Sequence, residues 1–195
     1  MADTYIKYND HSISSAFKDH YIVPDYQREY VWTDEQVEQL MADLLDAYNT
    51  DNKKAYFLGT IVTYDSGNQF ELIDGQQRLT TFFVLLCAIK KIYVRCGEQT
   101  SVIENLIYSP TMNSEGDVIN SYHLQLQYED AGNCLELIEK GQERPNYLTQ
   151  SGERLFDAFK TIQDFLSERF PDIASLKKFV VFLLNKTSFI RIETY

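Results

Sequence analysis

Apolar residues recur at helical spacing in the segment that follows Thr33. Intervals of three and four residues place them on one face of an α-helix. They are Val37, Leu40, Met41, Leu44, Leu45 and Tyr48. Thr33 and Gln36 have the spacing of a capping box, in which two side chains satisfy backbone N–H groups at the start of a helix. The pattern therefore predicts an amphipathic helix that begins at Thr33.

A second pattern, of short strands around a turn, precedes the most apolar part of the chain. Residues 57–64 and 69–73 have strand-like sequences, and the turn-forming residues 65–68 separate them, which is typical of a β-hairpin. The return strand leads directly into residues 75–95, which are apolar nearly all round as far as Ile89. We expect this last segment to be a central buried helix.

The rest of the chain alternates short helices, strands and loops. The expected elements are a helix over 12–20, a strand over 21–23, a polar and aromatic loop over 24–32, a helix over 102–108, a loop over 110–116, a strand over 122–127, a helix over 129–140, a linker over 141–150, helices over 152–169 and 176–183, and a strand over 187–195. This order predicts an α+β fold. We expect a core domain with a small β-sheet in residues 1–97 and a mostly helical region in residues 98–195. Because the chain stops inside a strand, we also expect it to be part of a longer protein.

The composition indicates a folded protein with an acidic surface. Hydrophobic residues make up 44% of the chain and aromatic residues 14%, which argues against disorder. The net charge of −11 would make the surface as a whole repel DNA and anionic membranes. Contact with a nucleic acid or a nucleotide would therefore need a local pocket or another domain.

Cysteine usage and hydropathy predict a cytoplasmic protein. The three cysteines, Cys87, Cys96 and Cys134, form no C-x-x-C pair, which favours a reducing compartment and offers no zinc site. The polar N-terminus lacks the pattern of a signal peptide. The longest nearly apolar run, residues 79–89, is too short to span a bilayer, so no membrane association is expected.

Candidate chemistry concentrates at the junction between the return strand and the buried helix, in the stretch Asp74-Gly75-Gln76-Gln77-Arg78. A helix start presents unpaired backbone N–H groups and the positive end of the helix dipole, which together form an anion site. The N–H groups of Gly75 and Gln76 would face a phosphate, and the Arg78 guanidinium suits bidentate phosphate binding. Asp74 could hold Mg²⁺ or polarise a water.

A second Gln-Arg pair, Gln27-Arg28, lies in the aromatic loop. Glutamine can orient a water or hydrogen-bond a base edge. Structural interpretations remain open for the same residues, with Asp74 as an N-cap, Arg78 in a surface salt bridge and the loop aromatics as a cover for the core. The sequence has no P-loop, H-E-x-x-H or G-x-S-x-G pattern, and its three histidines lack metal-ligand spacing.

Three blocks of the sequence, taken together, resemble one known family. The blocks are P-x-Y-Q-R-x-Y-V-W over 24–32, Y-F-L-G-T-I-V over 56–62 and I-D-G-Q-Q-R-L-T-T over 73–81. Their order and spacing resemble the DUF262 family, which forms the N-terminal half of GmrSD-type modification-dependent (Type IV) restriction and phage-defence proteins. The closing S-F-I-R-I-E-T also resembles a later strand of that family.

The resemblance implies a ParB/sulfiredoxin-like core with a nucleoside triphosphate pocket at the D-G-Q-Q-R helix start. By matching positions, Asp74, Gln77 and Arg78 are implied as catalytic residues, and Asp74 as the Mg²⁺ ligand. The implied nucleotide-binding residues are Gly75, Gln76, Arg78, Tyr26, Gln27 and Arg28. The nucleotide would be GTP, UTP or CTP. The implied partners are modified DNA, through the full-length protein, a C-terminal H-N-H nuclease domain and a second copy of the chain.

Three hypotheses for function follow. The first is a Mg²⁺-dependent, NTP-binding and NTP-hydrolysing regulatory domain of a restriction protein, since positioning and charge neutralisation are most of what phosphoryl transfer needs. The second is a non-catalytic sensor in which Tyr26, Tyr30 and Trp32 stack on a flipped base of modified DNA. The third is a ParB-like nuclease, for which the sequence offers no metal cluster.

Overall fold

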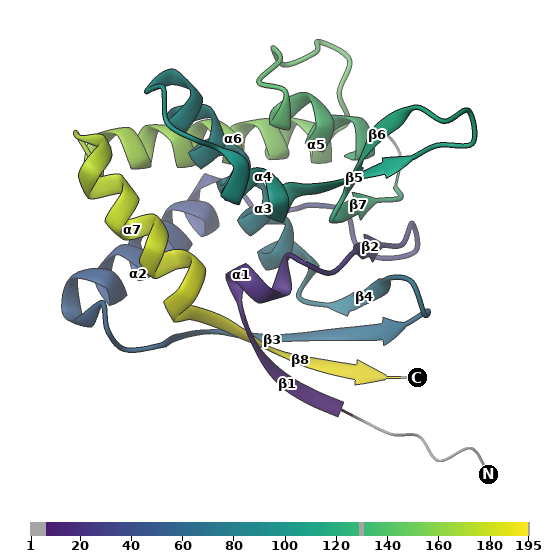
Figure 1. Cartoon of the computed structure of the whole chain (residues 1–195), viewed down its shortest axis with the longest axis horizontal. Helices are drawn as coiled ribbons and strands as arrows, with labels where there is room; N and C mark the ends of the chain where they lie inside the picture. The colour runs from purple at the N-terminus through teal and green to yellow at the C-terminus, as the bar shows by residue number, and fades with distance from the viewer. Residues whose placement is uncertain (1–6, 129–130, 195) are drawn as a thin grey trace.

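A computed structural model describes residues 7–128 and 131–194 of the chain (Figure 1). Its helices and strands in the described part, in chain order, are β1 (Lys7–Ser12), α1 (Ile13–Ala16), β2 (Tyr21–Val23), α2 (Asp34–Asp51), β3 (Tyr56–Asp65), β4 (Phe70–Asp74), α3 (Gln76–Arg95), α4 (Ser101–Ile107), β5 (Tyr108–Met112), β6 (Val118–Tyr122), β7 (Leu124–Leu126), α5 (Ala131–Glu139), α6 (Gln150–Arg169), α7 (Ile173–Lys186) and β8 (Thr187–Thr194). The α+β class expected from the sequence is confirmed.

Six strands form one mixed sheet in the order β1-β8-β3-β4-β2-β7, and β5 and β6 form a separate hairpin. β3 runs antiparallel to β4, as the sequence predicted for a hairpin, and parallel to β8. β2 lies parallel to both β4 and β7. The return strand β4 therefore lies between two other strands, β3 and β2, and is not an edge strand. It ends at Asp74, and α3 begins two residues later.

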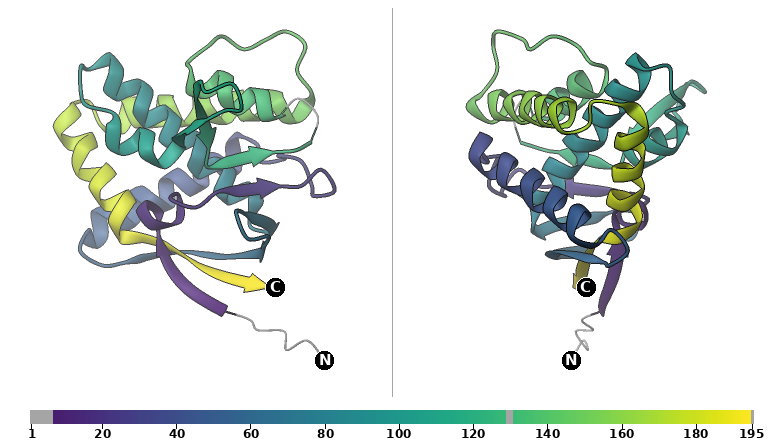
Figure 2. Two further views of the ribbon diagram at one scale, coloured as in Figure 1. Left: turned by 45° about the vertical axis from the view of Figure 1, so that its right-hand side comes forward. Right: turned by 90° about the vertical axis from the view of Figure 1, so that its left-hand side faces the viewer.

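Helix α3 is the central buried helix that the apolar run predicted. Every residue from Leu79 to Ile89 is buried, and each large apolar side chain buried in this way contributes about 1.5–3 kcal/mol. Phe82 of α3 meets Phe189 of β8 edge-on, with ring centroids 5.6 Å apart. The sheet thus packs one face on α3, while α6 crosses the helix from the far side (Figures 1 and 2).

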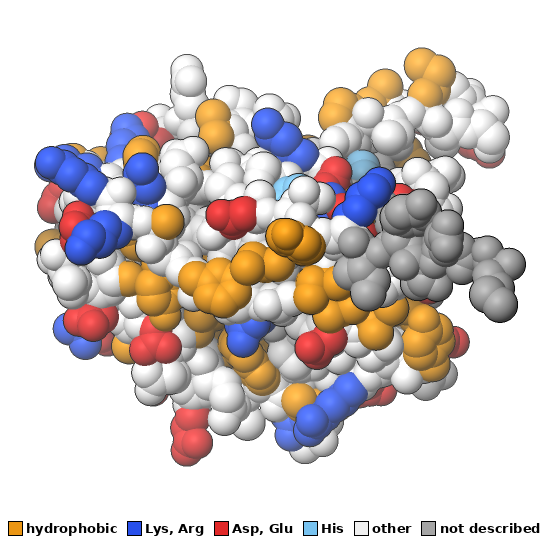
Figure 3. Space-filling view, turned by 90° about the horizontal axis from the view of Figure 1, so that it is seen from below, with side chains coloured by type: hydrophobic (Ala, Val, Ile, Leu, Met, Phe, Trp, Pro, Cys, Tyr) orange, Lys and Arg blue, Asp and Glu red, His pale blue; other side chains and the backbone are white. Residues whose placement is uncertain are grey.

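The opposite face of the sheet exposes apolar side chains. Tyr8 on β1, Tyr64 on β3 and Ile73 on β4 are all exposed. Seen from the side on which β1, β8 and β3 lie, hydrophobic side chains form a band across the molecule (Figure 3).

Two parts of the expected secondary structure were wrong. The helix expected over 12–20 is a single turn, α1, and a strand, β1, precedes it. Residues 110–116, expected as a loop, contribute to the hairpin of β5 and β6. In both cases the strands are held by backbone pairing, and their polar or irregular side chains give no alternating pattern to read.

The expected division after residue 97 stays a prediction. The main sheet takes strands from both sides of that boundary, since β8 lies between β1 and β3. The helix expected over 129–140 is present as α5 from Ala131, and its first two residues lie outside the described part of the chain.

A buried arginine connects β8 to the N-terminal segments. Arg191 is 6% exposed. Its guanidinium donates to Glu193 at 2.9 Å and to the Tyr21 hydroxyl at 3.0 Å, and it pairs with Asp19. The same group lies 4.1 Å from the centre of the Phe70 ring. This cluster joins β8 to the first residues of β2 and β4.

Replacing Arg191 by methionine should lower the free energy of unfolding by about 3–5 kcal/mol, because it leaves buried partners of a cation without compensation. The measurement is urea unfolding followed by circular dichroism. Lys54→Ala is the control, since the Lys54–Asp51 pair is 3.7 Å long and exposed and should contribute less than about 1 kcal/mol. Equal losses in the two variants would show that the cluster is not stabilising.

Candidate functional site

A glycine allows the first turn of α3 to pack closely against strand β3. Gly75, the residue before α3, has a φ of 88°, and a Cβ built on it would lie 2.7 Å from Cγ2 of Ile61. Only glycine fits both the left-handed backbone and this close approach. The helix start is therefore fixed on the middle of β3.

The start of α3 has no side-chain cap. Its N-cap is Gly75, no side chain accepts from the first turn, and no acidic residue lies in that turn. The interpretation of Asp74 as an N-cap was therefore wrong, and its carboxylate is exposed instead. The N–H groups of the first turn and the positive end of a 20-residue helix are thus free to face an anion.

Arg78 lies against the backbone of β3. Gly59 has a φ of 113°, and a Cβ there would lie 2.6 Å from Nη1 of Arg78. The second glycine therefore makes the space that the guanidinium fills. Within residues 7–128 and 131–194, Arg78 forms no ion pair, so the salt-bridge interpretation is not supported and the half-buried cation keeps its charge available.

Gln77 holds the aromatic loop on α3 with both ends of its amide. Its Oε1 accepts from the backbone N–H of Val31 at 2.8 Å, and its Nε2 donates to the carbonyl oxygen of Glu29 at 2.8 Å. The role in positioning an attacking water, predicted from the sequence, is untested. In this geometry the side chain positions the loop.

Tyr30 anchors the same loop in the core. The Thr81 hydroxyl donates to the carbonyl of Gln77 at 2.8 Å, so the buried Tyr30 hydroxyl donates to Oγ1 of Thr81 at 2.9 Å. The N–H of Tyr30 donates to Oγ of Ser151 at 3.1 Å. Burial raises the pKa of Tyr30, so it stays protonated. For Tyr30, the interpretation as a cover of the core is confirmed.

The residues Tyr26, Gln27 and Arg28 lie at the outer end of the loop. Tyr26 is 71% exposed, and its hydroxyl lies 3.4 Å from a carboxylate oxygen of Glu71. Arg28 is exposed and makes no ion pair in the described part of the chain. The structure thus brings this end of the loop toward β4, and the pocket role assigned to these residues stays a prediction.

A cavity of about 350 Å³ opens between α2, β3, the loop and Arg78. Its lining consists of Trp32, Gln36, Gln39, Leu40, Asp43, Tyr56, Leu58 and Arg78. The volume lies in the usual range for small-molecule sites. The three sequence blocks therefore meet here, since Trp32 comes from the first, Tyr56 and Leu58 from the second, and Arg78 from the third.

Sequence reasoning missed the residues that α2 contributes to this cavity. Gln36, Gln39 and Asp43 lie on the polar face of an amphipathic helix, which is usually solvated. Gln36 forms the expected capping box, since its Oε1 accepts from the N–H of Thr33 at 2.8 Å. Gln39 donates to Oδ1 of Asp43 at 2.7 Å. A spacing of three and four residues was the available signal, and it does not distinguish a site from a solvated face.

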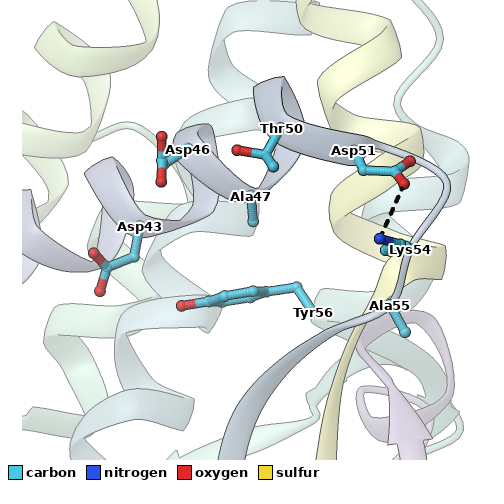
Figure 4. Close-up of a pocket in the computed structure, with 8 residues that line it drawn as sticks. All are labelled: Asp43, Asp46, Ala47, Thr50, Asp51, Lys54, Ala55 and Tyr56. Atoms are coloured by element: carbon cyan, nitrogen blue, oxygen red, sulfur yellow. Dashed lines mark ion pairs between the residues drawn. The ribbon is translucent and has the colours of Figure 1, made fainter.

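A second cavity, also of about 350 Å³, adjoins the first and is acidic. Its lining is Asp43, Asp46, Ala47, Thr50, Asp51, Lys54, Ala55 and Tyr56 (Figure 4). Asp43 and Tyr56 line both cavities. The Tyr56 ring lies below α2, with its hydroxyl directed to the side on which Asp43 lies (Figure 4). Its pKa is raised, first by burial and then by the negative charge of Asp43.

The described residues contain no group of three or more histidine, cysteine, aspartate or glutamate side chains placed to hold a metal ion. Asp74 is a single exposed carboxylate at the helix start. Such a residue fits Mg²⁺, which proteins commonly hold through one or two carboxylates together with substrate phosphates. His123, by contrast, is buried and hydrogen-bonded to Ser109 at 2.7 Å, so its role is structural.

Replacing Gln77 by alanine should loosen the loop and expose Trp32, because two backbone groups lose their partner. Trp32 is the only tryptophan of the chain, so its emission reports the change directly. We expect a red shift and faster quenching by acrylamide, with stability lowered by about 1–3 kcal/mol. Gln76→Ala is the matched control, since the Gln76 side chain makes no hydrogen bond within the described residues. Identical spectra for the two variants would show that the two hydrogen bonds of Gln77 do not hold the loop in place.

Comparison with known proteins places the chain in a family. No curated protein matches the sequence. Among the described residues, none of the helices has the length and apolar character that crossing a membrane requires. Residues 9–195 match the family model described as GmrSD restriction endonuclease, N-terminal domain. The match covers nearly the whole chain, including all three blocks and the last strand. The chain therefore belongs to the family of GmrSD restriction endonuclease N-terminal domains, which are parts of DNA restriction and phage-defence proteins.

Proposed function

We propose that the chain is a Mg²⁺-dependent, NTP-binding and NTP-hydrolysing regulatory domain of a restriction protein. The observation that carries the proposal is the placement of Arg78. Arg78 lies in the first turn of a helix that has no side-chain cap, and within the described residues its guanidinium has no carboxylate partner. It also lines a cavity large enough for part of a nucleotide. Helix starts and arginine side chains both bind phosphate groups in proteins.

The phosphates would lie at the start of α3. The N–H groups of Gly75 and Gln76 and the guanidinium of Arg78 would neutralise them, with Arg28 contributing from the loop. Asp74 would hold Mg²⁺, whose charge offsets that of the phosphate oxygens when it is bound. These groups are held in place before any ligand binds, because Gly75, Gly59 and Gln77 fix the backbone around them.

Hydrolysis would follow the usual displacement at the γ-phosphorus. The oxygen of a water attacks the γ-phosphorus, the bond to the β,γ-bridging oxygen breaks, and a nucleoside diphosphate leaves with that electron pair. With Asp74 on Mg²⁺, the proton of the water passes to the released phosphate. Gln77 is a positioning residue in this scheme, and the water-positioning role would require one of its two bonds to the loop to open.

The wider assignments remain proposals of the same kind. The mixed sheet with a buried helix behind it supports a ParB/sulfiredoxin-like core. The net charge of −11 opposes DNA binding by the surface of this domain, so contact with modified DNA would be made through the full-length protein, with cleavage by a C-terminal H-N-H domain. Direct nuclease action stays the third hypothesis, and the described residues offer no group of three or more metal-ligating side chains in its support. GTP, UTP and CTP remain the candidate nucleotides, and a homo-oligomer the proposed assembly.

The exposed side chain of Tyr26 favours a second candidate function, a sensor without turnover. Its ring is 71% exposed and belongs to a loop fixed on α3, so it is available to stack on an extruded base. Binding of modified duplex DNA without release of phosphate from any nucleotide would favour this function over hydrolysis.

Arg78→Ala and Asp74→Ala should each lower the rate of phosphate release from NTP and Mg²⁺ by about 100-fold, because each removes a charge aimed at the reacting group. The measurement is phosphate release from GTP, UTP, CTP and ATP, with and without EDTA. Arg95→Ala is the control, since Arg95 is an exposed arginine at the other end of α3. An unchanged rate in both site variants would refute the mechanism.

A further inference from the structure

The charges around the two adjoining cavities change from a cation at one end to mostly carboxylates at the other. Arg78 lines one side of the first cavity and makes no ion pair in the described part of the chain. The second cavity carries Asp43, Asp46 and Asp51. Among the residues that the structure describes, Asp51 alone of these pairs with a cation, Lys54 at 3.7 Å. Asp43 lines both cavities. A groove therefore runs from a cation to a set of carboxylates.

This polarity dictates the direction in which a nucleotide can lie. Carboxylates repel phosphate oxygens, and the cation and helix start attract them. The triphosphate therefore belongs at the Arg78 end, and the nucleoside points along the groove toward Asp43. Tyr56 lines both cavities.

The walls of the first cavity suit a flat ring. Trp32 and Tyr56 supply aromatic surfaces, and Leu40 and Leu58 supply apolar ones. Stacking on aromatic side chains binds any base without regard to its sequence. Discrimination between bases must then come from the polar groups on the rim, which α2 provides.

The polar rim presents hydrogen-bond acceptors. Nε2 of Gln39 donates to Oδ1 of Asp43 at 2.7 Å, which fixes the carboxylate. Oδ2 of Asp43 makes no hydrogen bond within the described residues. A carboxylate accepts two adjacent N–H donors, and guanine is the only common base with a ring N–H beside an amino group. Uracil places carbonyl oxygens on both sides of its ring N–H, and adenine and cytosine place a bare ring nitrogen beside the amino group.

Resting on the proposed function, we infer that the cavity of Trp32, Gln39, Asp43, Tyr56 and Arg78 is a base subsite that selects guanine nucleotides through the Asp43 carboxylate. Arg78 then has two neighbours, the phosphates at the helix start and the nucleoside in the cavity. The site comprises the α3 start and the polar face of α2, an element that the three sequence blocks do not include.

The test uses the fluorescence of Trp32, which lines the cavity. The chain, with Mg²⁺, is titrated rapidly with GTP, xanthosine triphosphate, ATP and UTP, and Asp43→Asn is compared with Asp46→Asn. Both variants remove one negative charge from the same helix, but Asp46 does not line the first cavity. Wild type should bind GTP at least about tenfold more tightly than UTP, because unpaired polar groups are costly in such sites.

Asp43→Asn should lose roughly tenfold in affinity for GTP and gain a similar factor for xanthosine triphosphate, since the asparagine amide donates to the carbonyl that replaces the guanine amino group. Asp46→Asn should differ from wild type by less than about twofold. Asp43 is exposed, so the fold should persist, and a gain for xanthosine cannot arise from unfolding. Gln39→Ala, which frees the Asp43 carboxylate, should show a smaller loss for GTP.

Three results would overturn the subsite. They are equal binding of all four nucleotides by wild type, identical behaviour of Asp43→Asn and Asp46→Asn, and phosphate release without any change in Trp32 emission. Each leaves the proposed hydrolysis intact. If none of the nucleotides changes the Trp32 emission and none is hydrolysed, the proposed function fails, and the subsite fails with it.

Discussion

The close approach of α3 to strand β3 is the constraint on which the site depends. Two glycines with positive φ make it possible, Gly75 beside Ile61 and Gly59 beside Arg78. A Cβ at either position would collide with its neighbour, so the helix start or the guanidinium would have to move. The backbone N–H groups of α3 and the charge of Arg78 are thereby held at one place on the sheet.

The aromatic loop behaves as an extension of α3 rather than as an independent loop. Gln77 bonds the loop backbone at Val31 and Glu29, and Tyr30 bonds Thr81 one turn further along the helix. The Tyr30–Thr81 bond is buried and the Val31–Gln77 bond is partly buried. Leaving a buried polar group unpaired costs about 1–3 kcal/mol, so the loop and the helix form one unit. This coupling explains why the Q-R-x-Y-V-W and D-G-Q-Q-R blocks belong together in space.

Local charge, rather than total charge, decides what this domain can bind. A net charge of −11 opposes association with polyanions over the whole surface. At the end of the groove nearest α3, a guanidinium without a carboxylate partner in the described residues and a free helix start create a small positive region. Carboxylates of α2 at the other end oppose phosphate. A compact anion with a neutral ring fits this arrangement, whereas an extended polyanion does not.

The sequence alone determined the elements whose signals are local. Helical spacing after Thr33, its capping box, the β3–β4 hairpin and the apolar run of α3 all fix structure through neighbours a few residues apart, and so does the placement of D-G-Q-Q-R at a helix start. Only the tertiary structure decided that β1 and β8 pair, that Gly59 accommodates Arg78, and that Gln39 and Asp43 face a cavity. Those outcomes depend on contacts between segments distant in the chain, and a polar helix face has the same sequence whether it meets water or a ligand.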